Sequence, residues 1–211
     1  HTETSPPPER FNFARHMIAL NAGRAGKTAL IDDAGQLTYG QLADQVQRCS
    51  TALTALGLRR EDRVLLLMHD CSDWVVSFLG ALHAGVVPVC VNTLLTAKDY
   101  AYMLADSRAQ AALVSGLLLP TLQTAMADGT HEVKQRIVSR SKDPLPEGAH
   151  DWAQLVASHQ PATGADTHGD EPAFWLYSSG STGVPKGTVH TQASLYWTAE
   201  LDATGRLRFL P

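Results

Sequence analysis

Apolar residues in this chain occur in two kinds of pattern that alternate along the sequence. Short continuous apolar runs, such as residues 64–68 and 86–91, are typical of strands that are buried on both faces of a parallel sheet. Between such runs, apolar residues recur every three or four positions, as they do over residues 39–56, which predicts amphipathic helices. The alternation predicts an α/β fold with a doubly wound, mostly parallel sheet and flanking helices.

The same two patterns predict the order of the elements. Helices are expected over residues 14–20, 39–56, 72–84, 96–105, 117–127, 151–158 and 192–201. Strands are expected over residues 28–31, 37–38, 63–68, 86–91, 111–115, 133–138, 172–177 and 187–190. Thr38 is expected to cap the helix that follows it, because a threonine hydroxyl can accept a hydrogen bond from a free backbone N–H of the first turn. The order of the strands within the sheet does not follow from the pattern.

Interruptions of the pattern divide the chain into four parts. Residues 1–10 are polar, contain Pro6-Pro7-Pro8 and are predicted to be extended. Residues 11–159 carry the alternating pattern and are predicted to form one α/β subdomain. Residues 160–170 contain little apolar material and are predicted to be a linker. Residues 171–211 resume the pattern and are expected to begin a second α/β subdomain, which is truncated in this sequence.

Composition narrows the classes of function. The 211 residues are 44% hydrophobic, which allows a sizeable core, and 21 acidic against 17 basic residues give a net charge of −4. Such a chain offers no general attraction to nucleic acid or to an anionic membrane. No uncharged apolar run reaches the roughly 18 residues that a membrane span needs. We therefore expect a soluble protein with neither a nucleic-acid nor a membrane partner.

The cysteines and histidines are not spaced along the chain as metal ligands usually are. Cys49, Cys71 and Cys90 are odd in number and form no C-x-x-C pair. They are expected to be reduced packing residues, which indicates a cytoplasmic protein. The nine histidines are scattered, so no metal site built by the chain itself is expected. His190 ends a predicted strand, and we expect it to be structural.

Residues 177–190 carry the strongest chemical signal. They are rich in glycine, serine and threonine, and they lie between the apolar residues 173–177 and the predicted strand 187–190. Glycines let the backbone approach an anion closely, amides and hydroxyls donate hydrogen bonds, and Lys186 adds a positive charge. A flexible linker is the alternative, but the tract is short and contains Pro185 next to the lysine. A phosphate-binding loop is therefore predicted.

Neither of the two common nucleotide motifs fits this loop. A Walker-type loop requires G-x-x-x-x-G-K-[ST], but counting from Gly180 the sixth position is Pro185, and Lys186 is followed by Gly187. A dinucleotide G-x-G-x-x-G fails because Gly180, Gly183 and Gly187 are wrongly spaced and no helix is predicted directly after them. The loop is instead expected to link two strands.

Residues 177–187, followed by residues 189–190, closely resemble the signature of the adenylate-forming enzymes. This family includes acyl-CoA synthetases, the adenylation domains of peptide synthetases and beetle luciferases. The resemblance covers residues 11–201, and its further matching segments are residues 37–42, 57, 62–64, 80–89 and 106–109. Within the family, residues 91–96 and 193–197 are most similar to ligases of aromatic acids, the benzoate-CoA ligases in particular. The chain resembles the N-terminal part of the family's large domain.

The resemblance implies ATP-dependent activation of an aromatic, benzoate-like carboxylic acid. The carboxylate attacks the α-phosphate of ATP, which gives an acyl-adenylate and pyrophosphate, and the thiol of coenzyme A then displaces AMP. Small-molecule acid, ATP and coenzyme A are the implied partners, with Mg²⁺ bridging phosphate oxygens. Lys186 is implied to assist phosphate binding, and Ser178 is a further candidate. The implied ligands of the β- and γ-phosphates are Ser179, Gly180, Ser181, Thr182 and Gly183.

Two other functions stay open at this point. The chain could be a peptide-synthetase-type adenylation domain that loads a carrier protein, or an inactive nucleotide-binding or scaffold module. Family members are much longer than this chain, and their acyl pocket and adenylation lysine lie further along. We therefore expect no activity from this chain alone and identify no catalytic residue within it. The identity of the acid is not encoded here, and a homodimer is left open.

Overall fold

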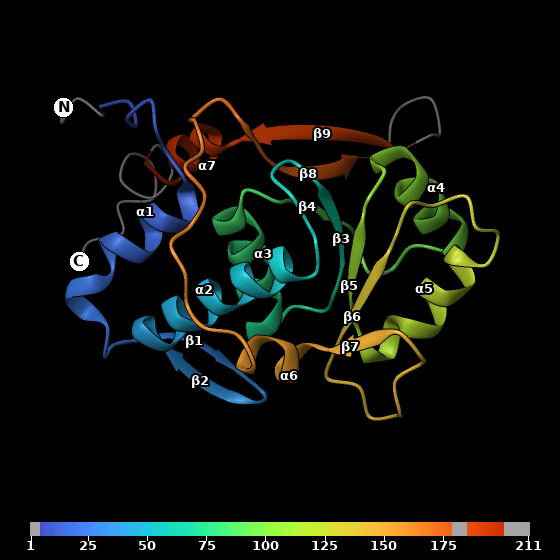
Figure 1. Cartoon of the computed structure of the whole chain (residues 1–211). Coiled ribbons are helices and arrows are strands. Elements are labelled where there is room, and N and C mark those ends of the chain that lie inside the picture. Colours follow the sequence, from blue (N-terminus) through green and yellow to red (C-terminus); the bar gives the residue numbers. More distant parts are fainter. Residues whose placement is uncertain (1–4, 179–184, 201–211) are drawn as a thin grey trace.

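The computed structural model of the protein describes residues 5–178 and 185–200. Within them, one seven-stranded sheet has the order β7-β6-β5-β3-β4-β8-β9, and a separate hairpin joins β1 and β2 (Figure 1). The strands are β1 (Thr28–Asp32), β2 (Gly35–Thr38), β3 (Arg63–Leu67), β4 (Val87–Cys90), β5 (Ala111–Ser115), β6 (Gln135–Ser139), β7 (Ala149–Asp151), β8 (Pro172–Ser178) and β9 (Lys186–Thr191). Neighbouring strands from β7 to β8 are parallel, and β9 runs antiparallel to β8.

Helices cover both faces of this sheet (Figure 1). The α-helices within the described residues are α1 (Phe13–Leu20), α2 (Tyr39–Ala55), α3 (Ser72–Ala84), α4 (Ala97–Ser107), α5 (Leu119–Met126), α6 (Trp152–Ala157) and α7 (Gln192–Thr198). Short 3₁₀ turns lie at Ala22–Arg24 and Gly116–Leu118. Every predicted helix and strand is present, with ends displaced by a few residues. The predicted fold class, a doubly wound and mostly parallel α/β sheet, is confirmed.

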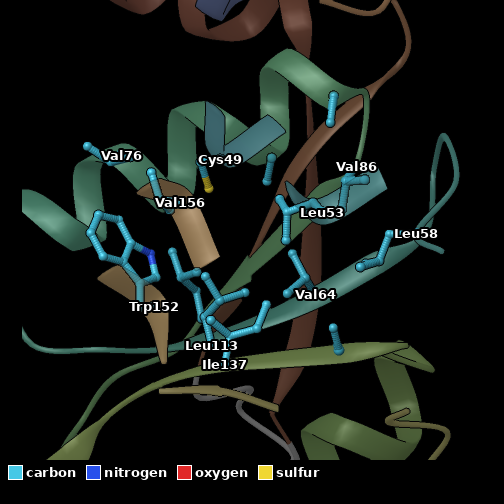
Figure 2. Packing of buried hydrophobic residues seen from close by; sticks show 14 of the residues in the cluster. Cys49, Leu53, Leu58, Val64, Val76, Val86, Leu113, Ile137, Trp152 and Val156 are labelled. Atoms are coloured by element: carbon cyan, nitrogen blue, oxygen red, sulfur yellow. The ribbon is translucent and has the colours of Figure 1, made fainter. Parts of the chain in front are cut away.

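The central strand β3 divides its side chains between two cores. Val64 and Leu66 pack on the face covered by α2, α3 and α6, whereas Leu65 and Leu67 pack on the face covered by α4 and α5. All four side chains are fully buried, and burying each contributes about 2 kcal/mol. Figure 2 shows the first core, where side chains from the helices, including Trp152, lie over those of the sheet. The continuous apolar run that predicted this strand reflects burial on both faces.

The connections between strands diverge at β3 and β4. The chain passes from β3 through α3 to β4, and then through α4 to β5, which pairs with the other side of β3. In doubly wound sheets, ligands bind at the carboxyl ends of strands where connections diverge in this way. β8 lies beside β4, with Val89 opposite Trp175 and Cys90 opposite Leu176. The carboxyl end of β8 therefore lies at this edge of the sheet.

Local signals set the ends of two helices. The Thr38 hydroxyl accepts a hydrogen bond from the Gln41 amide at 3.2 Å, and the Gln41 side chain accepts one from the Thr38 amide at 2.9 Å, so the predicted cap is confirmed. The helix α3 ends at Gly85, whose φ of 72° is one that residues with a side chain rarely adopt. A Cβ atom at Gly85 would also lie 3.1 Å from the Cβ of Ala165.

Two details of the strands differ from the sequence-based expectation. The strand β7 lies in a stretch that was not assigned to a strand, because three residues are too few to show a period, and it pairs with β6 through His150 and Ile137. The apolar run that predicted β8 is buried only in part, since Leu176 is 42% exposed while Ala173 is fully buried. An apolar run predicts a strand, but it does not show which other segments cover the two faces of that strand.

The sheet continues across the predicted boundary at residues 160–170. This segment contains no helix or extended strand, and backbone hydrogen bonds fasten it to the body of the protein: Ala165 N donates to His83 O at 2.7 Å, and Phe11 N donates to Thr167 O at 2.8 Å. Residues 5–10 likewise lie outside helices and ladders, apart from one bridge between Arg10 and His168. The division into two subdomains stays a prediction about a longer protein.

Arg140 fastens the β1–β2 hairpin to the main sheet. Its guanidinium donates to Asp32 Oδ2 at 2.7 Å and to Asp73 Oδ2 at 3.2 Å, and Asp32 Oδ2 also accepts from the Ser72 amide at 2.8 Å. The Ser72 amide, followed by Arg140, lowers the pKa of the Asp32 carboxyl far below its ordinary value. Asp32 therefore stays ionised well into acid solution. The hairpin, the start of α3 and the end of β6 meet at one ionic cluster.

Replacing Arg140 with methionine is expected to lower the free energy of unfolding by about 1–2 kcal/mol at pH 7, since two carboxylates lose their shared cation. Because the pKa of folded Asp32 is lowered, its contribution is present above the ordinary aspartate pKa of 3.8 and is lost as the pH falls below it. Because folded Asp32 is still ionised at pH 3, its ion pair with Arg140 persists there, and the deficit of the variant should be nearly the same at pH 3 and at pH 7, as measured by urea unfolding. Arg136→Met, which removes a hydrogen bond to the Glu147 carbonyl, is the control. A deficit that disappears at pH 3 would contradict this account.

Candidate functional site

The predicted phosphate loop connects two strands at the edge of the sheet. β8 leads into it and β9 leaves it, with Ser178 opposite Lys186 and Tyr177 opposite Gly187 in the antiparallel pairing. This strand-to-strand connection agrees with the rejection of both common nucleotide motifs, each of which opens a helix. Of the predicted site residues, Ser178 and Lys186 lie at the base of this hairpin. The others, Ser179, Gly180, Ser181, Thr182 and Gly183, lie outside the described residues.

Lys186 stands at the first position of β9 with an exposed side chain. In the part of the chain that the structure describes, no carboxylate forms an ion pair with it. Ser178, its neighbour across the strands, is also exposed. A free ammonium and a hydroxyl at the carboxyl edge of the sheet are suitable partners for an anionic ligand. The binding roles of both residues stay predictions.

Two aromatic rings approach Gly187 closely. A Cβ atom at this position would lie 3.0 Å from Cε3 of Trp175 and 3.5 Å from Cζ of Tyr177. Both rings belong to β8 and lie on the face that carries α4, where they pack against the second core. A residue with a side chain at position 187 would require the Trp175 ring to move by a few tenths of an ångström. The glycine thus has a packing reason besides any role near the ligand.

Tyr177 also forms a polar contact that sequence analysis missed. Its hydroxyl donates a hydrogen bond of 2.6 Å to Asp106 Oδ2 in the last turn of α4. Burial raises the pKa of Tyr177, and the neighbouring Asp106 raises it further, so the phenol stays protonated and continues to donate. The two residues are 71 positions apart in the sequence. Both lie in segments that resemble the adenylate-forming family, but nothing in their spacing indicates that they meet.

The neighbouring loop after β4 is held by a buried tyrosine. The Tyr100 hydroxyl donates to Asn92 O at 2.7 Å and accepts from the Leu95 amide at 3.2 Å. Burial raises the pKa of Tyr100, and the ring is fully buried in the second core. The loop that follows β4, beside the carboxyl half of β8, is therefore anchored to α4 as well.

His190 takes a packing position, as was expected. His190 stacks on Phe174 with ring centroids 4.5 Å apart and planes 7° from parallel. Phe174 in turn contacts Phe78 of α3 edge to face, with centroids 5.5 Å apart. This aromatic row holds the middle of β8 and β9 on α3, on the opposite face of the strands from Tyr177.

Other candidate chemistry is limited in the described residues. They contain no group of three or more histidines, cysteines, aspartates or glutamates placed to hold a metal ion. The three cysteines are unpaired, and burial raises the pKa of Cys49 and of Cys90 to about 12, so these thiols are unreactive. Nor does any described helix combine the length and apolar character that crossing a membrane requires. A cleft of about 460 Å³ lies between α1, α2, α3 and residues 161–164, lined in part by Arg15 and His83.

β8, the strand next to the edge of a doubly wound sheet, leads into a segment rich in glycine, serine and threonine that is followed by Lys186. This combination is typical of proteins that bind nucleotide phosphates. The sequence model of the AMP-binding enzyme family matches residues 19–209, and the chain belongs to that family. The benzoate-CoA ligase of Thauera aromatica is 47% identical over 96% of this chain. The 4-hydroxybenzoate-CoA/benzoate-CoA ligase of Rhodopseudomonas palustris is 39% identical over 89% of it.

Solved structures agree with this assignment. A benzoate CoA ligase from Burkholderia xenovorans LB400 superposes on 94% of the chain with a TM-score of 0.84 and 48% identity. An anthranilate CoA ligase in complex with anthranoyl-AMP covers 93% of the chain with a TM-score of 0.87 and 30% identity. The chain spans only 39% of the Thauera protein and 38% of the Burkholderia chain. It corresponds to the N-terminal part of these relatives, as predicted.

Proposed function

We propose that this chain is the N-terminal part of an AMP-forming acid–thiol ligase that activates an aromatic carboxylic acid of the benzoate type. The observation that carries the proposal is the 47% identity to a benzoate-CoA ligase over 96% of the chain. In the first step, a carboxylate oxygen attacks the α-phosphorus of ATP, and the bond to the leaving pyrophosphate breaks. In the second step, the sulfur of coenzyme A attacks the acyl carbon, and AMP leaves.

In this proposal the phosphate loop holds the part of ATP that becomes pyrophosphate. Attacker and target are both anionic, so the reaction needs neutralised charge and a fixed in-line geometry. Lys186, whose ammonium at the base of the loop has no carboxylate partner among the described residues, would neutralise charge on the phosphates, with Ser178 as a further donor. The amides and hydroxyls that would donate to the β- and γ-phosphates belong to Ser179, Gly180, Ser181, Thr182 and Gly183.

Magnesium fits this site only as a companion of the nucleotide. The described residues hold no acidic cluster at the hairpin, so the oxygens of the ATP phosphates would supply most of its ligands. Bound there, Mg²⁺ would supply further neutralisation of the phosphate charge. A cytoplasmic location fits the three unpaired cysteines. A homodimer stays a prediction.

Both named relatives among the curated proteins are CoA ligases, which favours coenzyme A over a carrier protein as the acyl acceptor. An inactive scaffold is less well supported, because Lys186 stands exposed at the base of the hairpin.

The test uses the complete gene product that carries this chain. Exchange of labelled pyrophosphate into ATP is measured with benzoate, hydroxybenzoates and an aliphatic control such as hexanoate, and the acyl-CoA product is identified by mass spectrometry. We expect exchange that depends on the aromatic acid, followed by thioester formation with coenzyme A. No exchange with any acid would refute the ligase proposal, and exchange without transfer to coenzyme A would favour a carrier-protein acceptor. Residues 1–211 alone are expected to show no exchange.

A further inference from the structure

The end of β8 projects beyond the strand that supports it. Pairing between β4 and β8 ends with Cys90 opposite Leu176. The last two residues of β8, Tyr177 and Ser178, pair only with Gly187 and Lys186 of β9. Two strands without a third neighbour form a ribbon that twists easily and is marginally stable by itself. The predicted phosphate loop is attached to the end of this two-stranded ribbon.

Tyr177 ties the projecting ribbon to the body of the protein in two ways. Its hydroxyl donates to Asp106 at 2.6 Å. Tyr177 also pairs with Gly187 of the partner strand, and its Cζ lies 3.5 Å from the position that a Cβ atom of Gly187 would take. Asp106 belongs to α4, whose Met103 and Leu104 are fully buried in the second core, so the acceptor is on a rigid element. Tyr177 therefore connects α4 with both strands that flank the loop.

The hydrogen bond is of a strong type. A neutral phenol donating to an ionised carboxylate is a charge-assisted pair, and the separation of 2.6 Å is in the short range typical of such pairs. Burial raises the pKa of Tyr177, so the proton that makes the bond is retained across the physiological range. Asp106 is itself exposed, and contact with water limits the strength of the hydrogen bond. Because the residue is exposed, it can be replaced without leaving a cavity in the core.

We propose that Tyr177 and Asp106 are positioning residues for the phosphate loop and, through it, for bound ATP. This inference rests on the function proposed above, since it assumes that the loop binds the nucleotide. Neither side chain is required to touch ATP. Their bond fixes the direction in which β8 enters the loop, and the pairing of Tyr177 with Gly187 carries this constraint to β9. Loss of the bond should leave the core intact while weakening the binding of ATP.

The proposal is tested in the complete gene product by steady-state pyrophosphate exchange, with ATP and the acid varied separately. Tyr177→Phe and Asp106→Ala should each raise KM for ATP about fivefold to tenfold, the range expected for one exposed charge-assisted hydrogen bond. KM for the acid should stay within about twofold. Asp106→Asn should raise KM for ATP less than Asp106→Ala does, because its carbonyl oxygen still accepts from Tyr177 but carries no charge. The double variant Tyr177→Phe with Asp106→Ala should be no worse than either single variant.

Tyr196→Phe is the matched control. It removes one tyrosine hydrogen bond, from the Tyr196 hydroxyl to Ser5 O at 2.9 Å, elsewhere in the protein. If the wild-type enzyme is active and Tyr177→Phe has an unchanged KM for ATP, the inference is overturned but the proposed ligase function still holds. Equal rises in KM for ATP and for the acid, or an equal effect in Tyr196→Phe, would also overturn it, because a general loss of structure would then explain the data. A wild-type protein without exchange would refute the proposed function and the inference with it.

Discussion

Replacing Lys186 with alanine in the complete gene product is expected to lower kcat/KM for ATP by about a hundredfold in acid-dependent pyrophosphate exchange. The reason is electrostatic. The ammonium stands at the first residue of β9, opposite Ser178, and no described carboxylate neutralises it. Because no described carboxylate pairs with the Lys186 ammonium, no ion pair has to be broken before it attracts a phosphate. Removing it would leave the triphosphate with one positive charge less at the base of the loop.

Folding should be unaffected by this change, because the Lys186 side chain is exposed. We expect the free energy of unfolding to change by no more than about 0.5 kcal/mol. Lys142→Ala, at another exposed lysine, is the matched control and should leave ATP kinetics within about twofold. Lys186→Arg should recover part of the loss, since it keeps the charge but not its compact shape. Unchanged ATP kinetics in Lys186→Ala would remove this residue from the site.

The elements of this fold could be predicted from sequence because each one leaves a local periodic signal. The order of the strands could not, since β4 and β5 are equally apolar runs and only tertiary packing decides that they lie on opposite sides of β3. The strand Ala149–Asp151 was not predicted, because three residues are too few to show an alternating pattern. Likewise, the exposure of Leu176 depends on which segments cover β8, and the apolar run itself holds no information about that.

The candidate site also has a part that the sequence could predict and a part that it could not. The loop could be recognised because its chemistry is contiguous: glycines, hydroxyls and a lysine within a few residues. The supports of the loop are not contiguous. Asp106 reaches Tyr177 from 71 residues away, and Arg140 joins Asp32 across 108 residues. Neither contact has a signal in spacing or composition, so both could be found only after the sheet had brought their strands and helices together.

His83 gives the stability of this protein an expected dependence on pH. It lies in the last turn of α3, is 2% exposed, and its Nδ1 atom has no hydrogen-bond partner among the described residues. Gly164 covers the ring so closely that a Cβ atom there would lie 2.7 Å from Nε2. Burial, followed by the nearby charge of Arg15, lowers the pKa of His83 from 6.5 to about 4. The folded protein therefore holds this imidazole neutral where the unfolded chain would already protonate it.

The sign of the effect follows from proton binding. Between pH 6.5 and 4 the unfolded chain binds more protons at this residue than the folded protein does, so stability falls as the pH is lowered through that window. From pH 7 to pH 5 the loss due to His83 is expected to be about 2 kcal/mol. His83→Gln, which cannot be protonated, should lack this part of the loss. Urea unfolding of wild type and variant at pH 7 and pH 5 measures it, with exposed His69→Gln as the control that keeps the wild-type loss. If His83→Gln loses as much stability on acidification as the wild type does, the buried neutral imidazole is not the cause, and the acid sensitivity of this fold must come from its carboxylates instead.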